Sequence, residues 1–180
     1  MVPEPAGAHE FRGWRRTRGV PIAPQSRPTT IPTGGPVCDC APAVDVPGAS
    51  PGGFSSREPA RPPAVRTLRR RLREWMATRD LDEDLTDAVL LLADEAVTNA
   101  VEHAAGERGC TVEVVANTRG CGGGIAVMVR DDGVWRPQPE DRGYRGRGVT
   151  LMGRMADRSS ISTSASGTTV RLCWALPSMN

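Results

Sequence analysis

The distribution of proline and leucine is the feature that most limits how this chain of 180 residues can fold. Thirteen of the 16 prolines and eight of the 20 glycines fall within residues 1–63, while the first leucine is Leu68. A segment of that composition cannot bury enough apolar side chain to offset the conformational entropy lost on ordering it. We therefore predict a disordered tail over residues 1–62 and a folded domain over residues 63–180.

The chain contains no lysine, and this excludes several classes of phosphate chemistry. All 23 basic residues are arginine, and the formal net charge is only +2. So small an excess argues against nucleic acid as a direct partner. The phosphate loop G-x-x-x-x-G-K-[ST], Schiff-base enzymes and protein kinases of the usual eukaryotic type all require an ammonium group. Phosphate must therefore be bound by arginine, a metal ion or backbone N–H groups.

The cysteines and the apolar runs bear on where the protein is located. The cysteines are Cys38, Cys40, Cys110, Cys121 and Cys173, an odd number without C-x-x-C spacing. That pattern indicates neither a disulfide framework nor a zinc ribbon, and it favours a reducing compartment. No apolar run approaches the roughly 20 residues that span a bilayer. Arg15 and Arg16 are not followed by an apolar helix, which argues against an export signal. We expect a soluble cytoplasmic protein with no membrane partner.

Hydrophobic periodicity after residue 63 predicts helices and antiparallel strands. Apolar residues recur at three- and four-residue steps over residues 64–79, and again from Leu85 past Ala100 to a stop at Gly106. The predicted strands alternate with period two over residues 111–117, 125–129, 160–164 and 168–174, and a short helix lies at 149–155. Elements in this order indicate an α+β fold, a two-layer sandwich with one face of the sheet covered.

Three polar residues recur every four positions along the second predicted helix. Glu95, Asn99 and His103 therefore line one stripe of that helix. An asparagine oxygen is a hard, neutral ligand suited to magnesium, and a glutamate one turn away can accept a proton from an attacking hydroxyl. A solvated polar face is an equally good interpretation of this helix alone.

Three later segments favour the functional interpretation. Asp131 ends a predicted strand just before Gly133, where its carboxylate can accept a hydrogen bond from an exocyclic amine, although Asp-Gly after a strand is commonly only a turn. Residues 143–149 bring arginines and glycines to the start of a helix, where a polyphosphate could lie; a mobile arginine-glycine loop is the alternative. Thr168 opens the final strand, where its hydroxyl could support a bound base or simply reflect strand propensity.

In this order and at these distances, the four segments resemble the N, G1, G2 and G3 boxes of the superfamily that contains gyrase, histidine kinases and MutL repair proteins. The resemblance covers about residues 64–176. The pattern Glu-Ala-Val-Thr-Asn-Ala-x-x-His and the ending Gly-Thr-Thr-Val-Arg-Leu are most similar to the small bacterial anti-sigma-factor serine/threonine kinases, particularly their actinobacterial relatives. The resemblance implies a mixed, mostly antiparallel sheet backed by about three helices, with ATP held between the N-box helix and a lid loop and Mg²⁺ bridging the phosphates.

The resemblance also assigns roles to individual residues. It implies that Asn99 binds magnesium, that Glu95 is the general base, and that Asp131 contacts adenine while Gly133 allows its close approach. The other implied ATP contacts are a lid hinge at Gly146 and Gly148, Arg145 or Arg147 at the terminal phosphate, and Thr168 at the adenine end.

One position departs from the family pattern and leaves two functions open. The G1 box usually reads Asp-x-Gly-x-Gly, but Trp135 stands at its last position, so the loop beneath the nucleotide is bulkier. The first hypothesis is a kinase that phosphorylates a serine on an anti-sigma-factor antagonist. The alternative is a binding module that holds ATP as a structural ligand and sequesters a sigma factor or antagonist with little or no turnover. A homodimer is also expected from the resemblance.

Overall fold

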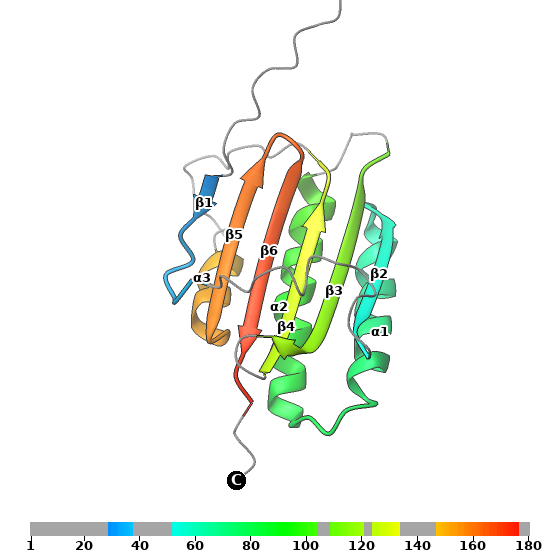
Figure 1. Ribbon diagram of the computed structural model, residues 1–180. Helices are drawn as coiled ribbons and strands as arrows, with labels where there is room; N and C mark the ends of the chain where they lie inside the picture. The colour runs from blue at the N-terminus through cyan, green and yellow to red at the C-terminus, as the bar shows by residue number, and fades with distance from the viewer. Residues whose placement is uncertain (1–28, 38–51, 104–108, 121–123, 134–146, 177–180) are drawn as a thin grey trace, which may run out of the picture.

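The computed structural model describes residues 29–37, 52–103, 109–120, 124–133 and 147–176 (Figure 1). In chain order its elements are β1 (Thr29–Ile31), β2 (Phe54–Pro59), α1 (Pro62–Met76), α2 (Glu83–His103), β3 (Thr111–Gly120), β4 (Gly124–Asp131), α3 (Arg147–Met155), β5 (Arg158–Ser164) and β6 (Gly167–Trp174). None of the helices in these residues combines the length and apolar character that a bilayer crossing requires.

The strands form one six-stranded sheet in the order β1-β5-β6-β4-β3-β2. Each neighbouring pair of strands is antiparallel. Figure 1 shows α1, α2 and α3 together on one face of this sheet, with α2 behind its centre. The α+β sandwich predicted from the sequence is therefore confirmed, as are the hairpin β3–β4 and the hairpin β5–β6.

Helix α1 begins where two prolines fix the backbone for a first turn. Pro62 and Pro63 occupy the first helical positions, where a missing N–H group costs no intrahelical hydrogen bond. Its buried side chains, Ala64, Leu68, Leu72 and Met76, repeat at four-residue steps and form the stripe that packs on the core. The helix predicted over residues 64–79 is thus present, shifted by two or three residues at each end.

Helix α2 begins at an aspartate that binds its free N–H groups. The Oδ1 atom of Asp82 accepts hydrogen bonds from the backbone N–H groups of Asp84 at 2.9 Å and Leu85 at 3.2 Å. This is N-terminal capping, and the acidic first turn also matches the positive end of the helix dipole. The cap fixes the residue at which α2 starts. It thereby also fixes where along the sheet the N-box residues Glu95 and Asn99 lie.

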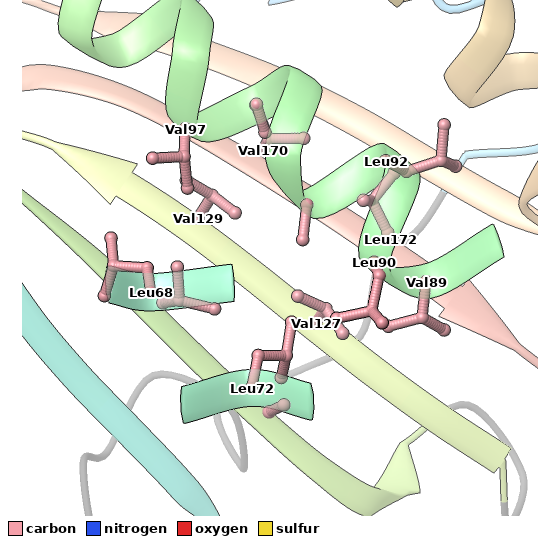
Figure 2. Packing of buried hydrophobic residues seen from close by; sticks show 14 of the residues in the cluster. Leu68, Leu72, Val89, Leu90, Leu92, Val97, Val127, Val129, Val170 and Leu172 are labelled. Carbon is pink, nitrogen blue, oxygen red and sulfur yellow. The ribbon is translucent and has the colours of Figure 1, made fainter. Parts of the chain in front are cut away.

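The main core lies between the helices and the sheet (Figure 2). Leu68 and Leu72 approach from α1, and the sticks of α2, β4 and β6 meet them over the middle of the sheet. The labelled partners are Val89, Leu90, Leu92, Val97, Val127, Val129, Val170 and Leu172, all below 10% exposure. This packing holds α2 rigidly across β4 and β6. Helix α2 is the element on which the candidate site is built.

Two expectations from the sequence are corrected by the structure. Residues 1–62 were expected to be disordered, yet β1 and β2 lie within that range and form the two edges of the sheet. The composition argument fails here because an edge strand obtains its hydrogen bonds from a neighbouring strand and needs few apolar side chains of its own. Cys173 is disulfide-bonded, which the odd number of cysteines without C-x-x-C spacing did not indicate.

The sheet also carries a smaller buried cluster on the face opposite the helices. It consists of Val115, Ala126, Met128 and Cys173, each 1–4% exposed. Strand register places Val115 opposite Met128 and Ala126 opposite Cys173, so the four side chains are neighbours across three strands. The sequence predicted one covered face, and the structure adds this second, smaller buried region.

Candidate functional site

Two neighbouring acids in the middle of α2 have different surroundings. Asp94 forms an ion pair with Arg69 on α1. Burial raises the pKa of Asp94, and the charges of Arg69 and Arg73 offset part of that rise. Glu95, one position further on, lies next to α3 instead. Asp94 therefore takes part in the contact between α1 and α2, whereas Glu95 belongs to the candidate site beside α3.

Glu95 and Asn99 meet the first turn of α3. A Cβ atom placed on Gly148 would lie 3.0 Å from Oε2 of Glu95 and 3.5 Å from Nδ2 of Asn99. Gly148 is buried, and the two polar side chains are each half-buried. Glycine at this position lets the start of α3 approach the polar stripe of α2, so a carboxylate, an amide and the free N–H groups of a helix N-terminus come together.

This group of atoms is chemically suited to a magnesium–phosphate ligand. Helix N-termini bind phosphate through unpaired N–H groups and the helix dipole. Magnesium uses one or two protein oxygens and completes its octahedron with phosphate oxygens and water, so a single asparagine is an adequate protein ligand. The carboxylate of Glu95 lies close enough to the same place to accept a proton from a nucleophile.

Asp131 forms a second centre, at the end of β4. It is 7% exposed, and its Oδ1 atom accepts hydrogen bonds from the N–H groups of Gly133 at 3.0 Å and Thr168 at 3.4 Å. Two backbone donors on one oxygen fix the direction of the carboxyl group. Thr168, which the resemblance assigned to the adenine end, is joined to Asp131 through its backbone N–H group.

Gly167 brings the start of β6 against the end of β4, and sequence reasoning missed it. Its φ is +121°, and a Cβ atom there would lie 1.9 Å from the backbone oxygen of Asp131. A side chain could not be accommodated without moving one of the two strands. The Ser166-Gly167 turn between two alternating segments was the available signal, since such turns often place glycine in a conformation closed to other residues.

Asp132, next to Asp131, has a structural role. It accepts hydrogen bonds from the N–H group of Thr111 at 2.6 Å and from the Thr111 hydroxyl at 2.8 Å. Burial would raise the pKa of Asp132, but these hydrogen bonds and the charge of Arg57 outweigh it and lower the pKa. The carboxylate therefore fastens the end of β4 to the start of β3.

Several predicted site residues lie outside what the structure describes. Arg145, Gly146 and Trp135 fall within residues 134–146, and the side chains of Arg147 and His103 are also not described, although both residues belong to helices. The roles predicted for these residues remain predictions. The structure brings together Glu95, Asn99 and Gly148 at one place, and Asp131, Gly133 and Thr168 at another.

The sheet, the three helices on one face, the polar stripe of α2 and the anchored Asp131 define a known class of domain. The family profile described as the histidine kinase-like ATPase domain matches residues 58–174, and the chain belongs to that family. The resemblance to the gyrase, histidine kinase and MutL superfamily is therefore confirmed, and the domain is an ATP-binding one.

A solved structure is similar over most of the chain. It is the crystal structure of the RsbU and RsbW domains of Rv1364c from Mycobacterium tuberculosis, with 27% sequence identity and a TM-score of 0.56. The similarity covers 71% of this chain and 33% of that one, so this chain spans about a third of the length of the protein it matches.

Proposed function

We propose that this chain is a Mg-ATP-dependent serine/threonine protein kinase of the anti-sigma-factor type. Its substrate would be a serine on a small regulatory protein, the antagonist of an anti-sigma factor, in bacterial transcription control. The proposal is supported by family membership, by the N-box resemblance and by the similarity to a chain that carries an RsbW domain. A sigma factor would be a second protein partner.

The approach of Glu95 and Asn99 to the first turn of α3 is the observation that carries this proposal. Asn99 would hold the magnesium ion, which neutralises phosphate charge when bound. Glu95 would accept the proton of the serine hydroxyl as that oxygen attacks the terminal phosphate. Phosphoryl transfer depends mainly on alignment and charge neutralisation, and the rigid packing of α2 provides the alignment.

The carboxylate of Asp131 would bind the adenine end. Its Oδ1 atom is held by two backbone N–H groups, so its orientation is fixed before a ligand arrives. An oriented carboxyl acceptor can pair with the 6-amino group of adenine, whereas guanine presents a carbonyl oxygen at that position, which offers no donor. Gly133, whose N–H group makes one of these bonds, keeps the approach to the carboxylate unobstructed by a side chain.

The first experiment is a calorimetric titration of the full chain with ATP, with and without magnesium. We expect saturable binding that depends on magnesium and that Asn99→Ala weakens by about tenfold or more, the range found for loss of a group at a metal site. Glu102→Gln is a suitable control because Glu102 is exposed on the same helix. Absence of binding at millimolar ATP in the unmodified chain would refute the proposed site.

A second experiment, which measures both ATP affinity and phosphate transfer, distinguishes the kinase from a module that only binds ATP. Glu95→Gln should leave ATP affinity nearly unchanged and lower phosphate transfer by about 10²–10⁴-fold, the usual contribution of a general base. Trp135 in the G1 loop is the sequence feature that favours the binding module. If partner regulation is the same in Glu95→Gln as in the parent chain, catalysis is not the function and the module is.

A further inference from the structure

Residues 29–37 dock on the domain from outside the segment that the family profile matches. That profile begins at residue 58, whereas β1 pairs with β5 through Thr29, Thr30 and Ile31 at the far edge of the sheet (Figure 1). Further along, the N–H group of Ser159 donates to the carbonyl of Pro36 at 2.9 Å. The segment therefore lies outside the residues that the family profile matches, although it is docked on them.

The same segment passes over α3 with backbone touching backbone. A Cβ atom on Gly153 would lie 2.0 Å from the carbonyl oxygen of Thr33, and one on Gly35 would lie 2.5 Å from the carbonyl oxygen of Gly153. Neither distance leaves room for a side chain, so both positions require glycine. Beside this contact the hydroxyl of Ser159 donates to Oγ1 of Thr33 at 2.9 Å, and Thr33 is 8% exposed.

Helix α3 connects this contact with the candidate nucleotide site. Gly153 lies under residues 33–35, and Gly148, five residues earlier in the same helix, lies against Glu95 and Asn99. Five residues of α-helix extend about 7.5 Å. A short helix moves as one body, so a displacement at Gly153 also displaces Gly148.

Within the part of the chain that the structure describes, a small set of interactions holds the docked segment. Its strand has three residues, Ile31 is its apolar side chain on the core, and Val37 is 60% exposed. Segments with few buried apolar contacts open at a free energy far below that of global unfolding. Residues 29–37 can therefore leave the edge of β5 while the rest of the domain stays folded.

We propose that residues 29–37 are a latch whose docking on β5 and α3 is coupled to Mg-ATP binding. The docked latch holds the first turn of α3 against Glu95 and Asn99, and its release lets that turn move away and weakens nucleotide binding. By linkage, bound Mg-ATP must stabilise the docked latch by the same factor. This inference rests on the proposed nucleotide site.

The test uses the full chain and two glycine variants that act from opposite sides of the contact. Gly153→Ala places a methyl group against Thr33, and Gly35→Ala places one against Gly153. In each variant we expect hydrogen exchange of residues 29–37, followed by mass spectrometry, to become about fivefold faster or more, and the Kd for Mg-ATP to rise by a similar factor. Val37→Ser, at an exposed position, is the control and should change neither quantity.

The double variant makes the test specific to the latch. If both methyl groups release the same contact, Gly35→Ala combined with Gly153→Ala should be no more severe than either change alone. Gly35→Ala lies outside α3, so its effect cannot come from an altered helix propensity at position 153. In the parent chain, saturating Mg-ATP should slow exchange of residues 29–37.

The possible failures are distinguishable. Unchanged exchange of residues 29–37 in both variants would overturn the latch. Faster exchange with an unchanged Kd for Mg-ATP would overturn the coupling and leave the proposed kinase site standing. If the parent chain binds no Mg-ATP, the proposed function fails and the coupling fails with it.

Discussion

Gly167→Ala is the change for which the structure specifies the consequence most closely. The residue has a φ of +121°, where an alanine is strained by about 1–3 kcal/mol. Its new Cβ atom would also lie 1.9 Å from the carbonyl oxygen of Asp131, while ordinary contact begins at 3.4 Å. The start of β6 and the end of β4 must therefore separate by about 1.5 Å, the difference between those two distances.

Separation of the two strands adds to the cost of strain. The hydrogen bond from the Thr168 N–H group to Asp131 is already 3.4 Å long and would be lost, and the contact of Ser164 with the Gly167 carbonyl would be disturbed. At about 0.5–1.5 kcal/mol for each of the two hydrogen bonds, added to the strain of about 1–3 kcal/mol, the total loss of unfolding free energy is about 2–6 kcal/mol. ATP affinity should fall as well, because Asp131 loses one of the two donors that orient it.

Urea unfolding followed by circular dichroism measures this loss, and Gly109→Ala is the matched control. Gly109 also has a positive φ, +87°, but a Cβ atom there would meet nothing within 4 Å. The control thus carries backbone strain without a collision, and we expect it to cost about 1–2 kcal/mol. Equal losses in the two variants would show that the approach of β6 to Asp131 is not tight, and the reasoning would be refuted.

Two further predictions concern the core and the dependence of stability on pH. Leu72 is 1% exposed, so Leu72→Ala should lower the unfolding free energy by about 2–5 kcal/mol. Leu91 is 41% exposed, so Leu91→Ala should change the unfolding free energy by less than about 0.5 kcal/mol. Similar urea midpoints for the two variants would contradict the assigned core. Folding lowers the pKa of Asp132, so its ionised carboxylate stabilises the folded chain. This contribution to the unfolding free energy should be complete above the pKa of the unfolded chain, about 4, and should disappear as the pH falls through the pKa of the folded chain. The difference in unfolding free energy between the parent chain and Asp132→Ala should therefore be larger at pH 7 than at pH 3, and a difference independent of pH would contradict the bonds from Thr111.

Local patterns in the sequence predicted the elements that carry the site. The four-residue repeat of apolar side chains indicated α1 and α2, and alternation indicated the two hairpins. The same periodicity placed Glu95 and Asn99 on one stripe of a helix, as the structure shows. Such predictions succeed because side-chain direction repeats with the geometry of the element itself and needs no knowledge of distant residues.

The edge strands and the close backbone contacts were decided by the tertiary structure alone. Proline-rich composition predicted disorder where β1 and β2 occur, because each of those strands is stabilised by hydrogen bonds to a strand more than 50 residues away. The contact of Asp94 with Arg69 on α1 and that of Glu95 with the start of α3 likewise come from how the helices pack. The sequence by itself determined the helices, the hairpins and the polar stripe of α2. Only the folded chain determined that Gly153 and Gly167 must lack side chains, since that requirement comes from backbone atoms brought near by packing.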